Sequence, residues 1–281
     1  MSEADLAPGE PVEGPSPAPL LGPDEPAPFA AENLEGRSRI LLVCEHGGRR
    51  FPARLGPLEL APEHREAHFV WDIGALALAR HLSGALDAPL LHQRYSRLLC
   101  DPNRRPDVPS YIPETGEGLP VPGNQGLSEA ERRQRTDEIW RPFHDGVTGV
   151  LDRRCAEGRT QALVTIHSFT PAFHGVARPW EAGVLYDRDP ALSPALFEVL
   201  HDRFGDLIGR NEPYAVGPET DYTIPVHGEQ RGLPCVEIEV RNDLLRDDAG
   251  TLRWSGILEG ALREACARVG IEVDPDAADG R

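Results

Sequence analysis

Short apolar runs alternate with amphipathic stretches through the middle of the chain. Runs of Leu, Val and Ile that are bounded by turn residues predict buried strands. They occur at 39–44, 163–167, 183–186 and 232–242, with a further strand or strand pair within 88–104. Apolar side chains at helical spacing predict helices at about 63–86, 128–157, 193–209 and 255–269. Strands that alternate with amphipathic helices predict a three-layer α/β domain.

Local signals refine the predicted helices and one loop. A capping box that begins at Ser128 opens the second helix, and Pro142 should kink that helix. Ser193 followed by Pro194 predicts an N-cap and the first helical position after it. The stretch 105–127 is rich in Pro and Gly and has no periodicity, which is typical of a lid or a substrate-binding loop.

The two ends of the chain differ in composition from its middle. Residues 1–36 are rich in Pro, Ala, Gly and Glu and contain few large apolar side chains. Such a segment buries too little surface to offset its ordering entropy, so we expect a disordered acidic arm. A single folded domain is expected over 37–270, followed by a flexible acidic tail at 271–281.

The charge balance excludes several classes of function. Net charge is −17, and all 29 basic residues are arginine. Nucleic acid and anionic membranes require a positive field, so neither is an expected partner. No apolar run approaches the roughly 18 residues of a membrane span, and no secretory signal is expected at the N-terminus. Five dispersed cysteines without a Cys-x-x-Cys pair favour free thiols in a reducing cytoplasm.

Two predicted strands end in a histidine, His46 after 39–44 and His167 after the apolar run from Leu163. Open α/β sheets place their ligands at the carboxyl ends of strands. Catalytic zinc commonly takes two histidines and one carboxylate and keeps a fourth position for water. The pair therefore suggests a mononuclear zinc site. The alternative is that His46 caps a turn and His167 forms hydrogen bonds within the core.

One face of the last predicted strand is strongly polar. Glu237, Glu239 and Arg241 share that face, opposite an apolar face. An ion pair on the polar face of an edge strand would account for Glu239 and Arg241. A buried carboxylate near a metal would account for Glu239 as well, as the general base that takes the proton of water.

Six motifs, taken in order, resemble the N-formylglutamate amidohydrolase family. They are Cys-Glu-His-Gly-Gly at 44–48, Trp-Asp-Ile-Gly-Ala at 71–75, Ser-Arg-Leu-Leu-Cys-Asp-Pro-Asn-Arg at 96–104, Ile-His-Ser-Phe-Thr-Pro at 166–171, Val-Leu-Tyr-Asp-Arg at 184–188 and Glu-Ile-Glu-Val-Arg-Asn-Asp-Leu at 237–244. The similarity covers roughly residues 38 to 265. It is to the broad branch of the family, because the histidine-degradation deformylases have Pro-His-Ser-Gly where this chain has Glu-His-Gly-Gly.

The resemblance implies both a fold and a metal site. The fold would be zinc-exopeptidase (phosphorylase/hydrolase)-like, as in carboxypeptidase-like hydrolases, with a mostly parallel twisted sheet between helices. His46 and His167 match the histidines that bind zinc in the family. Asp72 is the expected third ligand because its aspartate recurs in both branches, and Glu45 is the alternative. Glu239 matches the glutamate of the final strand and is expected to be the general base.

The resemblance also implies how a substrate is held. Asn103-Arg104 is similar to the pair that grips the substrate's α-carboxylate in carboxypeptidase-like enzymes, a task suited to a planar guanidinium. Arg97 and Arg241 are expected as second cations, for a side-chain carboxylate or for the oxyanion. His227 lies in a loop that could line the pocket. A positive pocket in a chain of net charge −17 would mark a small anionic substrate.

We therefore expect zinc-dependent hydrolysis of the amide bond of an N-acyl amino acid such as N-formylglutamate. One alternative is a carboxypeptidase-like peptidase that acts on short peptides. The other is a non-catalytic module that keeps a pocket for an anionic ligand and holds no metal. The sequence leaves the oligomeric state open.

Overall fold

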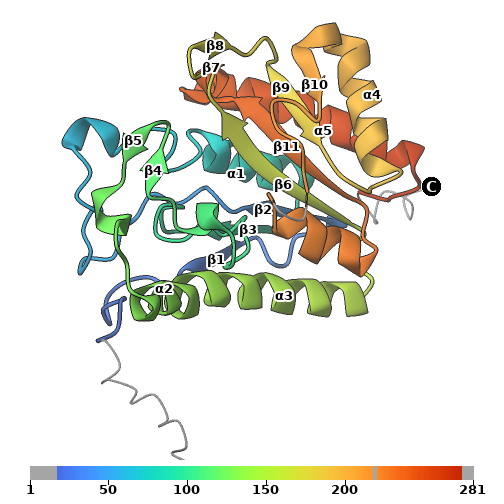
Figure 1. Ribbon diagram of the computed structural model, residues 1–281. Helices are drawn as coiled ribbons and strands as arrows, with labels where there is room; N and C mark the ends of the chain where they lie inside the picture. The colour runs from blue at the N-terminus through green and yellow to red at the C-terminus, as the bar shows by residue number, and fades with distance from the viewer. Residues whose placement is uncertain (1–17, 218–219, 274–281) are drawn as a thin grey trace, which may run out of the picture.

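A seven-stranded sheet forms the centre of the protein (Figure 1). The computed structural model describes residues 18–217 and 220–273. Strand order across the sheet is β1-β3-β2-β6-β11-β9-β10. Their bounds are Phe29–Glu32 (β1), Leu90–Gln93 (β3), Ile40–Cys44 (β2), Ala162–Phe169 (β6), Cys235–Arg241 (β11), Ala182–Leu185 (β9) and Ile208–Arg210 (β10).

The sheet is mostly parallel, as predicted. The four central strands β3, β2, β6 and β11 are parallel neighbours. β1 runs antiparallel to β3 at one edge, while β9 runs antiparallel to β11 and parallel to β10 at the other. Two small hairpins lie outside this sheet: β4–β5, made of Thr115–Gly116 and Leu119–Pro120, and β7–β8, made of Ala172–Phe173 and Val176–Ala177.

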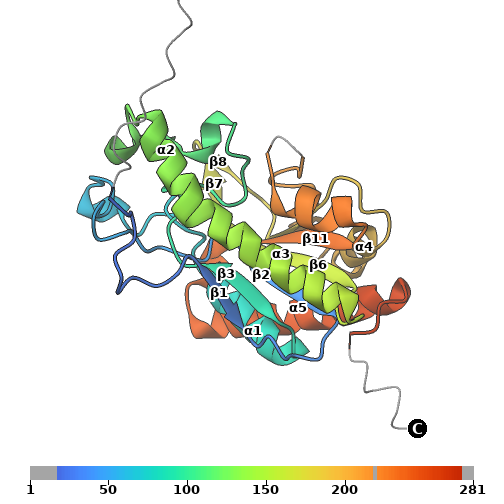
Figure 2. The ribbon, with the colours of Figure 1, turned by 90° about the horizontal axis from the view of Figure 1, so that it is seen from below.

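Helices cover both faces of the sheet, which confirms the three-layer α/β architecture. α1 (Ala75–Leu86), α4 (Leu192–Phe204) and α5 (Asp248–Arg268) pack on the face that carries Ile40 and Leu42. α3 (Arg141–Ala156) packs on the opposite face, against Leu41 and Val43. Figure 2 shows α3 crossing the strands on its side of the sheet. Alternate residues of β2 thus enter two separate cores, as the two-residue period of a strand requires.

A third apolar cluster lies under the long connections outside the sheet. It includes Tyr95, Leu99 and, from the stretch expected to be a lid or substrate-binding loop, Tyr111, Ile112 and Val121. All five side chains are buried. The stretch 105–127 is therefore anchored by its own core, and it contains the β4–β5 hairpin.

The first predicted helix is shorter than expected. α1 begins at Ala75, and the residues from 63 to 74 form a short 3₁₀ helix at Pro62–His64 and a series of turns. Gly74 has φ +83°, a left-handed conformation that interrupts a right-handed helix. Asp72 consequently lies in a turn before the helix, where its side chain is not committed to a helical face.

The second predicted helix is interrupted near Pro142. The capping box at Ser128 is present, and it starts α2 (Glu129–Arg135). A π-helical turn at Thr136–Trp140 then leads into α3, and the Arg141 amide donates to the Thr136 carbonyl five residues back. Pro142 has no amide hydrogen to donate, so a break in the α-helical hydrogen-bond ladder is expected there.

The prediction around Ser193 was wrong in its details. α4 begins at Leu192, and Ser193 donates its hydroxyl to the Cys235 carbonyl instead of capping the helix. The helix ends at Phe204, and Gly205 has φ +57°. The residues expected to form its last turn, 208–210, belong to β10. The packing of that short strand against β9 overrides its helical periodicity.

Both predicted domain boundaries were misplaced. β1 forms the sheet edge from within the expected arm, and the buried Leu20 donates its amide to Glu138. At the other end Ile271 and Val273 are buried in the core that contains α5. The remaining parts of the two expected flexible ends, 1–17 and 274–281, lie outside the described residues. Among the described helices none combines the length and the apolar character needed to cross a membrane.

We predict opposite effects of two glycine-to-alanine changes at α1. A Cβ at Gly74 would overlap the Leu245 side chain and lie 2.7 Å from its carbonyl oxygen, so Gly74→Ala should lower the free energy of unfolding by about 2–4 kcal/mol. Gly84 lies in the same helix with open space around it, and Gly84→Ala should raise stability by about 0.5–1 kcal/mol. Urea unfolding measures both, and a Gly74→Ala variant as stable as wild type would contradict the role of this turn.

Candidate active site

A pocket of about 300 Å³ opens at the carboxyl ends of the central strands. Its lining comes from the β2 end, the turn before α1, the loop after β3, the β6 end, residues 214–215 and 220–221, and β11. The residues are His46, His68, Asp72, Arg97, Asn103, Arg104, His167, Ser168, Tyr214, Ala215, Thr220, Asp221, Glu237 and Glu239. Parallel sheets of this kind place ligands at this edge.

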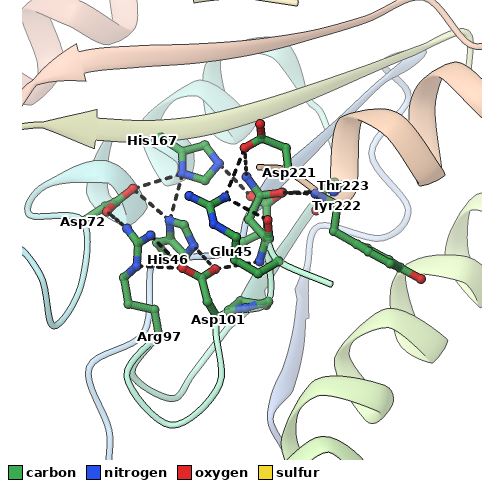
Figure 3. A network of polar contacts seen from close by, with 12 residues as sticks. Glu45, His46, Asp72, Arg97, Asp101, His167, Asp221, Tyr222 and Thr223 are labelled. Atoms are coloured by element: carbon green, nitrogen blue, oxygen red, sulfur yellow. Dashed lines mark hydrogen bonds and ion pairs between the residues drawn. The ribbon is translucent and has the colours of Figure 1, made fainter. Parts of the chain in front are cut away.

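Three predicted metal ligands of the pocket lining point towards one another (Figure 3). The Nδ1 atoms of His46 and His167 lie 3.2 Å apart. Asp72 Oδ2 lies 3.4 Å from the first and 3.0 Å from the second. All three residues are buried. The group could hold a metal ion, because one ligand atom from each residue lies within 4.8 Å of the others.

A buried carboxylate stands behind each imidazole. Asp101 Oδ1 lies 2.7 Å from His46 Nε2, and Glu45 Oε2 lies 3.1 Å from His167 Nε2. The hydrogen bond to Asp101 favours a proton on His46 Nε2, which leaves the His46 Nδ1 lone pair free for a metal. Glu45 and His167 Nε2 are within ion-pair distance but form no hydrogen bond. Glu45 thus faces the opposite edge of the His167 ring from Asp72, so Asp72 is the carboxylate that completes the cluster.

Carboxyl groups outnumber arginines around the cluster, which differs from the expectation of a positive pocket. The lining carries four carboxyl groups, from Asp72, Asp221, Glu237 and Glu239, and two guanidinium groups, from Arg97 and Arg104. Asp101 and Glu45 add two more carboxyl groups behind the imidazoles. Buried charges of one sign need a counter-charge. A divalent cation among His46, Asp72 and His167 would supply it, so the donor set fits a metal such as zinc.

Glu237 and Glu239 project from β11 towards the cluster. The β6–β11 register pairs Glu239 with His167 and places Glu237 one step back along the same face. Burial is the main cause of the raised pKa values of both glutamates. The pKa of Glu237 rises to about 7, and the pKa of Glu239 rises well above its ordinary range. Glu239 Oε2 is buried and has no hydrogen-bond partner among the described residues. A carboxyl group in this state is suited to exchange a proton with a bound molecule.

Arg97 bridges two of the carboxylates around the histidines. Its Nη1 lies 3.2 Å from Asp72 Oδ1, and its Nη2 lies 2.7 Å from Asp101 Oδ2. Burial lowers the pKa of Arg97, but the effects of Asp101 and Asp72 are together larger and raise it. The side chain, 22% exposed, also lines the pocket. Arg97 is therefore a fixed positive group beside the ligand cluster.

Asn103 and Arg104 both reach the pocket, but their surroundings differ. The Asn103 amide oxygen accepts from the backbone amides of Tyr222 and Thr223, and its nitrogen donates to Asp221. These bonds hold the 221–223 segment in place. Arg104 donates to the Thr220 carbonyl and pairs with Asp221 at 3.3 Å, with 23% of its side chain exposed.

Two predicted substrate-binding residues lie outside the pocket lining. Arg241 pairs with Asp243 at 2.8 Å and donates to the Trp180 carbonyl. It is the last residue of β11, where the chain turns into a 3₁₀ helix and the alternation of faces ends. His227 is buried against His144, with ring nitrogens 2.9 Å apart, and burial lowers its pKa to about 4.

Several pocket residues escaped the sequence analysis. Asp101, which lies behind the His46 imidazole, stands inside the Asp-Pro-Asn-Arg motif, and that motif was the signal that could have found it. Tyr214 and Asp221 lie in a Pro- and Gly-containing loop without periodicity, which gave no signal. His68 precedes Asp72 by four residues and lines the pocket, yet it stands in no recognisable motif.

We predict that the site costs stability when no metal is bound. The raised pKa of Glu239 makes the folded state bind more protons than the unfolded state, so stability falls as pH rises above about 4.3. With a chelator present, Glu239→Gln should be more stable than wild type at pH 8 by at least about 1 kcal/mol, with a smaller difference at pH 4. Urea unfolding measures this, with the exposed Glu63→Gln as control. Equal stabilities at pH 8 would contradict the prediction.

Comparisons with known proteins agree with this fold. The family model of N-formylglutamate amidohydrolase matches residues 38–246. A gene product of Agrobacterium tumefaciens of known crystal structure is 37% identical, with a TM-score of 0.86 over 89% of this chain and 99% of that one. The N-formylglutamate amidohydrolase of Ralstonia eutropha is 21% identical, with a TM-score of 0.64 over 87% of this chain and 99% of that one. No match is found among curated proteins. The chain belongs to the N-formylglutamate amidohydrolase family, which indicates an amidohydrolase.

Proposed function

We propose that the protein hydrolyses the amide bond of an N-acyl amino acid, such as N-formylglutamate, with the help of zinc. The observation that carries this proposal is the convergence of His46, Asp72 and His167, in which each imidazole is backed by its own buried carboxylate. A pocket of about 300 Å³ suits a substrate of this size. The five free cysteines support a reducing, cytoplasmic location.

His46, Asp72 and His167 would hold the metal, and Asp101 and Glu45 would fix the orientation of the two rings. Zinc held by two histidines and a carboxylate lowers the pKa of its water to about 7 and polarises a carbonyl oxygen. The role of the surrounding residues is then to move protons and to position the substrate.

Glu239 is the proposed general base. It lies beside His167 in the strand register, and its Oε2 has no protein partner among the described residues. This oxygen would take a proton from water as the water oxygen bonds to the acyl carbon. The same proton would go to the amine nitrogen as the carbon–nitrogen bond breaks. The products are the carboxylate of the acyl group and the free amino acid.

Arg97 and Arg104 have separate proposed roles. Arg97 is fixed by Asp72 and Asp101 beside the cluster, so its charge can stabilise the oxyanion that develops on the acyl carbonyl. Arg104 is partly exposed at the pocket wall and would hold the α-carboxylate of the substrate. Asn103 is assigned to positioning of the 221–223 segment, because its amide bonds are made within the protein.

A panel of N-acyl amino acids tests the proposed function. The zinc-loaded protein should release amino acid from at least one N-formyl substrate, and Glu239→Gln should lower kcat by about 10²–10⁴-fold while zinc content stays unchanged. Glu237→Gln, on the same strand face, should reduce kcat far less, and the surface change Glu63→Gln should leave it unchanged.

Two results would contradict the proposal in different ways. Full activity of Glu239→Gln would refute the assignment of the base, and a large loss in Glu237→Gln alone would transfer that role to its neighbour. Absence of turnover on acyl amino acids together with cleavage of dipeptides would identify a peptidase instead.

A further inference from the structure

A nearly buried arginine lies beside the pocket, immediately after the β7–β8 hairpin. The hairpin follows β6, the strand that carries His167, and Figure 1 shows it beyond the end of that strand. Arg178 is only 9% exposed. Its guanidinium carbon lies over three aromatic rings, 5.7 Å from the centroid of Phe169, 4.8 Å from that of Phe173 and 4.7 Å from that of Tyr214. The rings fix the plane of the guanidinium and stabilise its charge.

Arg178 differs from the other arginines near the site in having no carboxylate partner. Arg97 pairs with Asp72 and Asp101, and Arg104 pairs with Asp221. Among the described residues, no carboxylate oxygen lies within the 4.0 Å of an ion pair with Arg178. Its Nη1 donates to the carbonyl and hydroxyl of Thr170, at 3.4 and 3.2 Å. A buried guanidinium without an anion is costly unless a ligand supplies one.

Tyr214 connects this arginine with the pocket. Tyr214 lines the pocket and stacks on the guanidinium of Arg178. Burial and then Glu239 raise the pKa of the Tyr214 phenol, while Arg178 acts in the opposite direction. The positive field of Arg178 therefore reaches Tyr214 on the pocket wall.

We propose that Arg178, together with the Tyr214 hydroxyl, selects acyl amino acids that have an acidic side chain by binding the side-chain carboxylate. This inference rests on the proposed function, in which Arg104 holds the α-carboxylate. The sequence analysis assigned the second carboxylate to Arg97 or Arg241. Arg97 and Arg104 already have proposed roles, and Arg241 pairs with Asp243, whereas Arg178 has no carboxylate partner among the described residues and is therefore assigned this task.

Two substrates of nearly equal shape test the proposal, N-formylglutamate and N-formylglutamine. Arg178→Gln should lower kcat/KM for the glutamate substrate by about 10- to 100-fold, mainly through KM, because a charge-assisted hydrogen bond is lost. The glutamine substrate should change by less than about threefold. Arg178→Lys should restore part of the preference. Arg210→Gln is the matched control, because Arg210 also stacks on a ring, at 4.3 Å from Phe197, but is exposed, and Phe197, unlike Tyr214, does not line the pocket.

Equal losses on both substrates would show a structural role for Arg178 and overturn the proposal. If Arg178→Gln does not fold, Tyr214→Phe replaces it, and its loss should again be larger for the glutamate substrate. Should the wild type hydrolyse no compound of the acyl amino acid panel, the proposed function fails, but calorimetric titration with free glutamate and glutamine still decides the role of Arg178. Tighter binding of glutamate that disappears in Arg178→Gln supports the proposal, and binding without such a preference overturns it.

Discussion

The parallel pairing of β2, β6 and β11 is the constraint on which the site depends. Parallel strands end at the same edge of a sheet, so His46 after β2, His167 on β6 and Glu239 on β11 meet there. The β6–β11 register fixes Glu239 directly beside His167. The turn that ends at Gly74 then brings Asp72 against both imidazoles. One sheet edge thus gathers residues that lie far apart in the sequence.

The same geometry concentrates carboxyl groups in a buried space. Asp72 and Asp101 share Arg97, which offsets part of their charge. Glu237 has only weak contacts with Asn103 and His167, and Glu239 Oε2 has no hydrogen-bond partner among the described residues, so burial holds both pKa values high. Replacing those side chains would raise the free energy of unfolding of the metal-free protein, since buried acids without a counter-charge are costly. Stability alone therefore does not account for the arrangement. A cation bound at the imidazoles would explain their presence, and functional sites commonly carry such a cost.

The sequence predicted the parts of the site that follow from strand ends. His46 and His167 were found because each closes an apolar run, and Glu239 because acids on an inner strand are unusual. Asp72 needed the family resemblance, since the turn at Gly74 that separates it from α1 has no periodic signal. Arg241 lies outside the pocket lining, because it is the last residue of β11 and the chain turns there into a 3₁₀ helix.

The layers of the fold were predicted correctly, but its edge strands were not. The central strands and helices have strong patterns, whereas β1 and β10 are short and are stabilised by neighbours in the sheet. Composition alone placed 18–36 in a disordered arm, yet β1 pairs with β3. Arg178 was missed for a similar reason. Its significance comes from three rings and an absent carboxylate, and both are properties of the folded chain.

The metal content of the purified protein tests the central claim most directly. Elemental analysis of the wild type after dialysis against zinc should give about one zinc ion per chain. His167→Ala should lose most of that metal, while the exposed His201→Ala should keep it. A wild-type protein that remains metal-free, or a His167→Ala variant that keeps its full zinc content, would contradict a metal centre at His46, Asp72 and His167.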